Sequence, residues 1–309
     1  MMVERGARVG VLMGGLAAEF DISMQSGKAV SGALRERGWD VVDIVVDRDL
    51  ARKLVDARVD VAWVALHGRF GEDGCVQGLL EVMGVPYTGS GVRASAVAMD
   101  KIATKRALAH EPGVRLARDW VLRAGGSLPD DVALPVVVKP GVGGSTIDIG
   151  IVRDQGALAE AIVEARKYDE ILLVEEYVEG DEITVAVVDG SPLPVVRILP
   201  ESGFFDFAAK YTKGLTRYEC PAAISNKATR LASEAAVQAF VGLGCAGLAR
   251  ADFIVPANQE PVFLEINTIP GMTATSLSPM AAKPLGMSFE DLVERVLHGA
   301  HCMEPEYTP

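Results

Sequence analysis

The segment 250–273 constrains the fold most, because it is predicted to form two antiparallel strands joined by a polar turn. Side chains of a strand alternate between its two faces, so Arg250 and Asp252 share one face of the first strand. Glu265 and Asn267 share a face of the second strand. If the turn spans Pro256–Pro261, the register places Asp252 opposite Glu265 and Arg250 opposite Asn267. The opposite face is then expected to consist of Ala249, Ala251, Phe253, Val255, Val262, Leu264 and Ile266.

Two carboxylates, an amide and a guanidinium therefore meet on one face of this predicted hairpin. Facing carboxylates repel each other unless a positive charge lies between them. Oxygen atoms of Asp, Glu and Asn are ligands of Mg²⁺, which usually binds alongside substrate phosphates. An ordinary solvated sheet face is the alternative, and it is the commoner meaning of such alternation. The Pro270-Gly271 bend favours a ligand site, because it brings free backbone N–H groups near the same face.

Strands alternate with helices through the first part of the chain, which predicts βαβ units and a parallel sheet. Strands are expected at 8–13, 41–46 and 61–66, and helices from about 23, at 50–57 and at 76–83. Ligands of such sheets gather at the carboxyl ends of the strands. The sequence places Gly14-Gly15 and His67-Gly68 there. His67 is therefore a candidate functional residue, and a purely structural histidine is an equally good alternative.

Composition argues against several classes of protein. The formal net charge of -12 and the pI of about 4.9 do not suit a nucleic-acid-binding surface. The sequence contains no apolar run of bilayer-spanning length, and its N-terminus does not have the pattern of a signal peptide. The scattered cysteines form no C-x-x-C pair, which favours reduced thiols over zinc or redox motifs. We therefore expect a cytoplasmic protein without nucleic-acid or membrane partners.

A glycine-rich loop follows a predicted buried strand that ends at Lys139. The loop reads Pro140-Gly-Val-Gly-Gly-Ser145, and its free N–H groups can cradle phosphate oxygens while Lys139 adds a positive charge. The lysine precedes the glycines, so this is not a Walker A loop. A tight turn that uses glycine for its positive φ is an equally good explanation.

Two further segments are candidate elements of a nucleotide site. The apolar strand predicted at 171–175 ends in acidic residues that continue to Glu182, which could hold adenine and ribose; a solvated strand end explains them as well. The irregular stretch 201–220 carries Lys210-Tyr211 among phenylalanines. A connection of this length is more often a functional lid than a passive link, and anchoring of the loop to the core by its phenylalanines is an alternative that is compatible with a lid.

Taken together, these motifs resemble the ATP-grasp superfamily and, within it, the D-alanine–D-alanine ligases. The residues that carry the resemblance are Gly14-Gly15 with Glu19 and Ser23, ALHGRFGEDG around His67, the segment ending at Lys101, VKP at Lys139, GGS at Ser145, Lys210-Tyr211, RADF, EINTIPGMT, and SLSPMAA from Ser276. The resemblance covers nearly the whole chain and implies an α/β, three-domain ATP-grasp fold. It implies an N-terminal substrate domain (1–89) with a Rossmann-like parallel sheet. A central subdomain (90–174) and a C-terminal subdomain (175–309) with the metal site and lid loop would follow.

The resemblance also implies roles for individual residues in nucleotide binding. The ATP-binding residues would be Lys101, Lys139 and Ser145 for the phosphates, Glu175, Glu176 and Val178 for adenine, and Glu182 for ribose. Two Mg²⁺ (or Mn²⁺) ions would be held by Asp252, Glu265 and Asn267, in agreement with the alternation of the hairpin.

A second group of implied roles concerns the amino-acid substrates and the reaction. The oxyanion would be stabilised by Arg250 and the backbone of Gly271. The ammonium of the first D-alanine would be bound by Glu19, with His67 nearby. The carboxylate of the second D-alanine would be contacted by Lys210, Ser276 and Leu277. The closed loop would be joined to the other domains by Glu19, Ser145 and Tyr211.

The activity implied is ATP-dependent ligation of two D-alanines through a D-alanyl phosphate, for peptidoglycan precursors, in a homodimeric enzyme. One alternative is a related ligase with D-lactate, D-serine or a biosynthetic analogue as acceptor. Lys210-Tyr211 favours an amine acceptor instead. A non-catalytic nucleotide-binding protein is another alternative, which the intact acid–amide–arginine set disfavours. The sequence departs from the family pattern at Phe20-Asp21-Ile22, Asp148, Phe205, Phe207 and Ala208. These departures bear on the kinetics and on the choice of acceptor.

Overall fold

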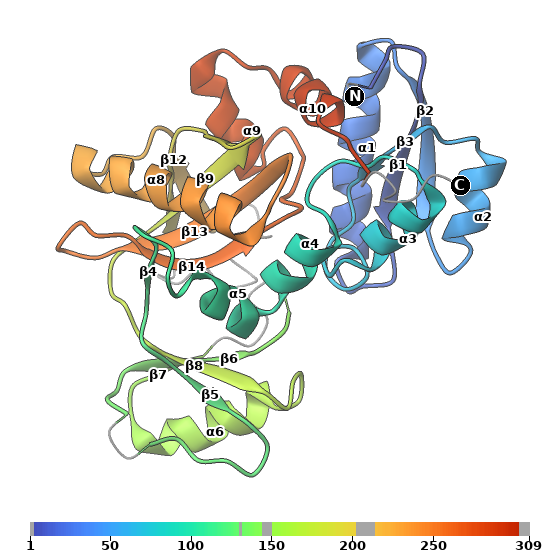
Figure 1. Cartoon of the computed structure of the whole chain (residues 1–309). Helices are drawn as coiled ribbons and strands as arrows, with labels where there is room; N and C mark the ends of the chain where they lie inside the picture. Colours follow the sequence, from blue (N-terminus) through green and yellow to red (C-terminus); the bar gives the residue numbers. More distant parts are fainter. Residues whose placement is uncertain (1–2, 130–131, 144–149, 202–213, 303–309) are drawn as a thin grey trace.

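The computed structural model describes residues 3–129, 132–143, 150–201 and 214–302. Its first unit is a parallel sheet of strand order β2-β1-β3, as the sequence predicts. The strands are β1 (Arg8–Gly14), β2 (Asp40–Val46) and β3 (Val61–Val64), and the helices are α1 (Phe20–Glu36), α2 (Leu50–Asp56) and α3 (Cys75–Met83). Side chains of α1 pack on one face of the sheet, and those of α2 and α3 pack on the other. Figure 1 shows this unit in blue.

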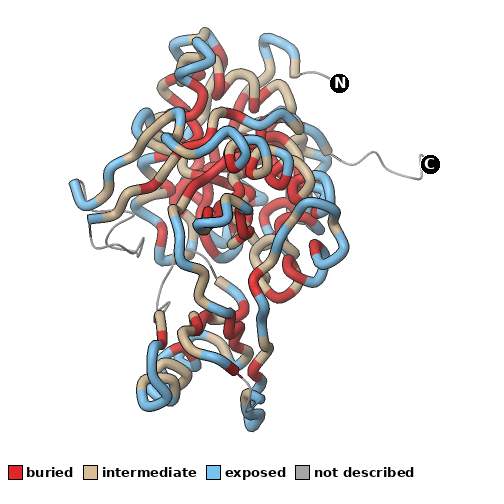
Figure 2. Tube along the Cα trace, turned by 90° about the vertical axis from the view of Figure 1, so that its left-hand side faces the viewer, coloured by how far each residue is buried: buried red, intermediate tan, exposed pale blue. Residues whose placement is uncertain are grey.

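A second, smaller unit contains an antiparallel sheet of order β5-β8-β6-β7. Its elements are β5 (Asp119–Leu122), β6 (Val136–Pro140), β7 (Gly150–Val152), β8 (Leu172–Glu176) and helix α6 (Gln155–Ala165). The helix covers one face of the sheet over an apolar cluster that includes Val136, Leu172 and Val174. Figure 2 shows this unit hanging below the main body, with its own buried residues.

The third unit is a larger sheet of order β12-β11-β9-β13-β14-β4, with β10 paired to β9. Its elements are β4 (Arg115–Leu116), β9 (Asp181–Val188), β10 (Ser191–Pro192), β11 (Val196–Pro200), β12 (Thr216–Glu219), β13 (Leu248–Val255), β14 (Val262–Asn267), α8 (Asn226–Leu243) and α9 (Leu277–Ala282). Helix α8 packs on one face of this sheet, and α9 packs on the other. The division of the chain at residues 89/90 and 174/175 stays a prediction.

The hairpin of β13 and β14 has the predicted register at its functional end, with Arg250 opposite Asn267 and Asp252 opposite Glu265. Beyond Asp252 the register shifts, and Phe253 pairs with Phe263. Our prediction that Val262 and Leu264 share the core face with Phe253 is therefore wrong. The irregularity brings Phe263 into the core instead, in edge-to-face contact with Phe253. A bulge of this kind adds a residue to one strand and restarts the alternation.

Two helices that link the first unit to the others place residues at the centre of the molecule. They are α4 (Val92–Met99) and α5 (Lys101–Leu108), and the carboxylate of Asp100 caps α5 by accepting from the N–H groups of Ile102 and Ala103. The cap places Lys101 at the first position of α5. It therefore fixes the direction in which this helix leaves the turn.

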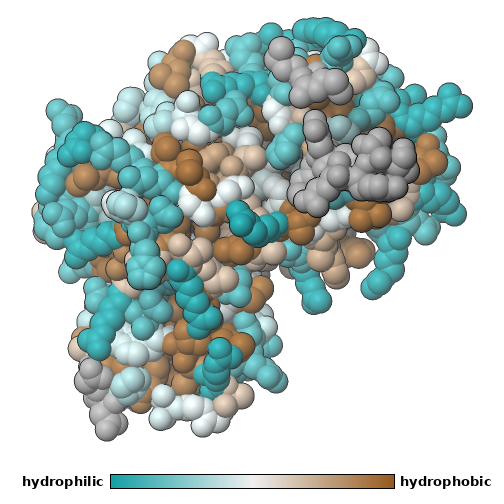
Figure 3. Space-filling view, viewed as in Figure 1, coloured by the Kyte–Doolittle hydropathy of each residue, from teal (hydrophilic) through white to brown (hydrophobic). Residues whose placement is uncertain are grey.

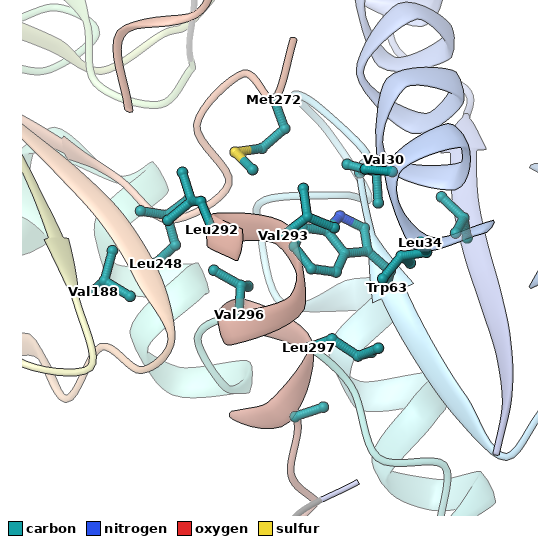
Figure 4. Packing of buried hydrophobic residues seen from close by; sticks show 14 of the residues in the cluster. Val30, Leu34, Trp63, Val188, Leu248, Met272, Leu292, Val293, Val296 and Leu297 are labelled. Carbon is teal, nitrogen blue, oxygen red and sulfur yellow. The ribbon is translucent and has the colours of Figure 1, made fainter. Parts of the chain in front are cut away.

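The last helix, α10 (Phe289–His298), follows the short helix η1 (Lys283–Leu285) and packs between the first and third units. Figure 4 shows Leu292, Val293, Val296 and Leu297 of α10 between Trp63 on one side and Val188 on the other. A capping box formed by Ser288 and Asp291 begins the helix. The apolar contacts of α10 therefore hold the N-terminal sheet against the C-terminal sheet.

None of the helices in the described part of the chain has the length and hydropathy needed to cross a bilayer. On the face drawn in Figure 3, hydrophilic residues are spread widely and hydrophobic residues occur in scattered groups.

Candidate active site

A pocket of about 320 Å³ lies where the three units meet. Its walls come from α1, the segment after β3, the α4–α5 turn, the loop at Gly143, and the end of β14 with the bend that follows. The predicted site residues that line it are His67, Lys101, Arg250, Glu265, Asn267, Gly271, Ser276 and Leu277. The fold therefore brings together residues that are far apart in the sequence.

Arg250 and Asp252 form a two-pronged ion pair along β13. Nε of Arg250 donates to Oδ1 of Asp252 at 2.9 Å, and an Nη atom donates to Oδ2 at 2.8 Å. The hydroxyl of Thr184 on β9 also donates to Oδ1 of Asp252, at 2.5 Å. Asp252 is only 4% exposed and lies behind Arg250, so its carboxylate orients the guanidinium toward the pocket. Such bidentate pairs have a defined geometry as well as strength.

Glu265 and Asn267 present oxygen atoms to the pocket from β14. Oε2 of Glu265 lies 3.2 Å from Nζ of Lys101, which also donates to the carbonyl of Gly143 at 2.7 Å. Oδ1 of Asn267 accepts from the N–H of Ile269 at 2.9 Å, which fixes the start of the bend. The pocket therefore combines a lysine and an arginine with carboxylate and amide oxygens.

The donor chemistry of this hairpin fits magnesium. Asp252, Glu265 and Asn267 each have a side-chain oxygen, the ligand type that hard divalent cations take. Within the described ranges there is no group of three or more His, Cys, Asp or Glu residues arranged to hold a metal ion. Two carboxylates and one amide would leave ligand positions to be filled by other oxygens, such as those of a phosphate.

Glu175 of β8 is buried between two lysines. Its Oε2 lies 2.6 Å from Nζ of Lys139, and its Oε1 lies 2.6 Å from Nζ of Lys105. Burial would raise the pKa of this carboxyl, but Lys139 and Lys105 together hold the pKa down at about 2. The pKa of Lys139 is raised, because the nearby carboxylates of Glu175, Glu265 and Glu182 outweigh its burial.

The other predicted adenine and ribose residues lie along β8, β9 and the connection between them. Glu176 is exposed at the end of β8, its N–H donates to the carbonyl of Arg118, and Val178 and Glu182 are half-buried. Glu182 belongs to β9 and is close enough to Lys139 to raise the pKa of the lysine. The residues predicted to contact ATP therefore line the edge between the second and third units.

His67 and Glu19 lie together at the carboxyl end of the N-terminal sheet. Nε2 of His67 lies 3.3 Å from the hydroxyl of Ser26 on α1. The pKa of His67 is lowered to about 4, mainly by burial and also by the charge of Arg250, so the ring is neutral at pH 7. Glu19 is buried against Gly68, where an added Cβ would come within 2.5 Å of a carboxylate oxygen. A glycine with φ +68° is therefore required beside Glu19.

Ser276 and Gly271 shape the opposite wall of the pocket. The hydroxyl of Ser276 accepts from the N–H of Thr273 at 3.0 Å and lies 2.9 Å from its hydroxyl. An added Cβ at Gly271 would come within 3.2 Å of Oγ of Ser276. The bend after β14 is therefore closed on itself by side chains of the EINTIPGMT segment and the helix that follows.

Comparison with known proteins identifies the family. Residues 49–90 match the family described as D-ala D-ala ligase N-terminus, and residues 119–298 match the one described as D-ala D-ala ligase C-terminus. The chain belongs to the D-alanine–D-alanine ligase family. A curated D-alanine–D-alanine ligase from Syntrophotalea carbinolica is 50% identical over 95% of this chain and 96% of its own length. Another, from Anaeromyxobacter sp. strain Fw109-5, is 49% identical over 96% of this chain and 97% of its own length.

Solved structures of this ligase family have the same fold. The D-alanine–D-alanine ligase from Bacillus anthracis, complexed with ATP, is 32% identical, has a TM-score of 0.84, and matches 95% of this chain and 97% of its own. The VanG D-Ala:D-Ser ligase from Enterococcus faecalis is 27% identical, has a TM-score of 0.80, and matches 95% of this chain and 99% of its own. The α/β ATP-grasp fold implied by the sequence motifs is thereby confirmed.

Three site residues that the ligase resemblance implies fall on parts of the chain that are not described. Ser145, Lys210 and Tyr211 lie outside the described residues, as do the departures at Asp148, Phe205, Phe207 and Ala208. Their roles stay predictions.

Sequence reasoning missed several polar residues of the ligase pocket. Glu72 lines the pocket and accepts from the N–H of Gly68 at 2.6 Å. Burial raises the pKa of Glu72 to about 8, and the nearby carboxylates of Glu19 and Glu265 add to that rise. The sequence feature that could have identified Glu72 is its position in the ALHGRFGEDG segment, which follows the same strand as His67. Ser26 was also missed, although it lies one helical turn after Ser23 on α1.

Proposed function

We propose that this protein joins two D-alanine molecules into a dipeptide, using ATP to activate the carboxylate of the first. The observation that carries the proposal is the pocket in which Lys101, Glu265, Asn267 and Arg250 meet the backbone bend at Gly271. Membership of the D-alanine–D-alanine ligase family supports this activity, as does the likeness to a ligase structure complexed with ATP. The dipeptide would serve as a peptidoglycan precursor.

In this proposal the nucleotide lies between the second and third units. Lys101 and Lys139 contact the phosphates, together with Ser145 of the glycine-rich loop. The adenine and ribose contacts are Glu175, Glu176, Val178 and Glu182. Two Mg²⁺ (or Mn²⁺) ions are held by Asp252, Glu265 and Asn267, and they supply charge neutralisation at the phosphates when bound.

The first chemical step activates a poor acyl donor. The carboxylate of the first D-alanine attacks the γ-phosphorus of ATP, the bond to the β-phosphate oxygen breaks, and ADP leaves. The product is an acyl phosphate. Lys101 and Lys139 stabilise the negative charge that moves onto the β-phosphate of the leaving ADP. Glu19 holds the ammonium group of this substrate, and neutral His67 lies beside it without adding a competing positive charge.

The second step forms the peptide bond. The neutral amine of the second D-alanine attacks the acyl carbon, and a tetrahedral oxyanion forms. Arg250 and the N–H of Gly271 stabilise that oxyanion. As it collapses, the C–O bond to the phosphate breaks, and the nitrogen loses a proton to the departing inorganic phosphate. Asp252 holds the guanidinium of Arg250 in a fixed orientation, so little reorganisation is needed during the reaction.

The second D-alanine is bound through its carboxylate by Ser276 and Leu277, together with Lys210. Tyr211 and Ser145 join the closed loop to Glu19, and closure of the loop keeps water from the acyl phosphate. The proposal also includes the three-domain division at residues 89/90 and 174/175, a homodimer, and a cytoplasmic location where ATP is available.

An acceptor screen tests this function. Purified protein with ATP and Mg²⁺ is expected to release phosphate only when D-alanine is added, with D-alanyl-D-alanine identified by mass. Phosphate release with D-serine or D-lactate but not with D-alanine would replace the proposed acceptor. ATP binding without turnover of any of these compounds would contradict the proposed activity.

A further inference from the structure

Lys105 is a buried lysine in α5 whose ammonium group contacts three oxygen atoms. It is 6% exposed, and its Nζ donates to Oε1 of Glu175 at 2.6 Å and to the carbonyl of Ala117 at 2.8 Å. Its third contact is Oδ1 of Asp119, at 3.1 Å. A lysine ammonium has three donors. Two of them have hydrogen-bond partners, Asp119 adds an ion pair, and the three contacts come from β5, β8 and the segment that precedes β5.

Through Glu175, Lys105 acts on a residue of the proposed nucleotide site. One carboxylate oxygen of Glu175 is taken by Lys105 and the other by Lys139, both at 2.6 Å. With both oxygens held, the carboxylate cannot rotate without breaking a charged hydrogen bond. Glu175 therefore connects the ammonium group of Lys105 to that of Lys139.

Lys105 and Lys101 connect helix α5 to the other two units. Residues four apart lie on the same side of a helix, so Lys101 and Lys105 project from one side of α5. Lys101 pairs with Glu265 of the third unit, and Lys105 pairs with Glu175 of the second unit. Helix α5 is therefore linked to both sheets through ion pairs.

Fold stability alone does not explain a buried lysine at this position. Charges are costly to bury, and replacement of a buried ion pair by apolar residues of similar size is often neutral or stabilising. An apolar side chain would fill the space under α5 without desolvation of an ammonium. A role in orienting charged groups explains why two lysines and two carboxylates lie together here, namely Lys105, Lys139, Glu175 and Asp119.

We propose that Lys105 is a positioning residue for the nucleotide: it clamps Glu175 and thereby sets Lys139, and with it the ATP-binding edge of β8 and β6. The inference rests on the proposed function, because it assumes that Lys139 and Glu175 contact ATP. Lys105 itself does not touch the substrate. Its removal therefore affects nucleotide affinity more than chemistry once ATP is saturating.

The main test is Lys105→Met, which keeps the length of the side chain and removes its charge. A lost charged hydrogen bond corresponds to about a ten- to hundredfold change, so KM for ATP is expected to rise by that factor. The KM for D-alanine and kcat at saturating ATP are expected to change less than about twofold, within the scatter of a surface substitution. Lys105→Arg keeps the charge and is expected to recover part of the affinity for ATP. Lys167→Met, at an exposed lysine paired with Glu164 in the second unit, is the matched control.

Lys105→Met takes a cation away from two carboxylates, the buried Glu175 and the partly exposed Asp119, so it could unfold the protein. The double variant Lys105→Met/Glu175→Gln removes one of them and completes a mutant cycle with Glu175→Gln. If Lys105 acts through Glu175, the added Met substitution is expected to change KM for ATP little in the Gln background. An equal rise in both backgrounds would overturn the proposed route, and a lowered melting temperature with unchanged KM for ATP would make the role purely structural.

Calorimetric titration with ADP separates this inference from the proposed activity. If the wild-type protein shows no D-alanine-dependent turnover, the proposed activity is contradicted. The comparison of ADP affinities still tests the positioning role of Lys105. Weaker ADP binding by folded Lys105→Met than by wild type and by Lys167→Met is the expected result. Equal ADP affinity of the three proteins would overturn the positioning role.

Discussion

Lys101 and Glu265 form an ion pair across the candidate active site, with Nζ 3.2 Å from Oε2. The lysine begins α5, and the glutamate lies near the end of β14, so the pair links a connecting helix to the hairpin. In the proposed function both groups serve the triphosphate, one as a cation and the other as a metal ligand. Binding of the nucleotide therefore requires each of them to exchange a protein partner for a phosphate or a metal ion.

We expect Glu265→Gln to abolish turnover. The amide keeps the size of the side chain but loses the charge that pairs with Lys101 and that would bind a divalent ion. Phosphate release in the presence of ATP, Mg²⁺ and D-alanine measures the effect. Raising the Mg²⁺ concentration is expected to recover a small part of the activity, because the remaining ligands bind metal more weakly.

The control for this prediction is Glu260→Gln on the turn of the same hairpin. Glu260 pairs with Arg115 and Lys227 at the surface, and such exposed pairs contribute about 0–1 kcal/mol. Its substitution is expected to leave turnover unchanged. Near-normal activity of Glu265→Gln itself would contradict the assignment of Glu265 as a metal ligand.

Arg250→Lys is expected to lower kcat about a hundred- to a thousandfold, the usual effect of losing an oxyanion donor. Lysine keeps the charge, but it cannot reproduce the two-pronged contact with Asp252 that orients the guanidinium. Steady-state kinetics measure kcat and the KM values for ATP and D-alanine. Arg230→Lys on α8, where Arg230 pairs with Glu234 at the surface, is the control. A rise in KM for D-alanine with unchanged kcat would assign Arg250 to substrate binding instead.

The parts of the site that were predictable depend on local patterns. Alternation along β13 and β14 was enough to place Asp252 opposite Glu265. Strand–helix alternation was enough to predict the parallel sheet that carries His67 at one edge. In each case the signal lies within a few consecutive residues and follows from the geometry of a strand.

The parts that were missed depend on partners far away in the sequence. Lys105 is 70 positions from Glu175, and nothing near it in the sequence predicts burial of its ammonium. Helix α4 was missed because its small residues give a weak helical pattern, and the helix is stabilised by packing against the third unit. The irregularity between Asp252 and Phe253 was missed because two phenylalanines pack together across the strands. Such contacts are visible only once the chain has folded.

Ser26→Ala is expected to raise KM for D-alanine by about two- to tenfold, the effect of losing a neutral hydrogen bond. The hydroxyl of Ser26 contacts Nε2 of His67 and accepts from the N–H of Met272, both at 3.3 Å, so it joins the histidine to the bend that contains Gly271. Ser31→Ala on the same helix is the control. Its buried hydroxyl has no hydrogen-bond partner among the described residues. An unchanged KM for D-alanine in Ser26→Ala would show that the bend is positioned without this contact.

Glu72→Gln is expected to make the protein more stable at alkaline pH. Burial raises the pKa of Glu72 from 4.5 to about 8, so the folded state retains a proton that the unfolded state has lost. Wild type therefore loses stability as the pH rises from about 4.5 to 8, and the glutamine variant does not carry this loss. Urea unfolding at pH 5 and pH 9 measures it, with an expected gain for the variant of about 2–4 kcal/mol at the higher pH. The exposed Glu36→Gln is the control. Parallel pH profiles for wild type and Glu72→Gln would mean that Glu72 is ionised in the folded protein.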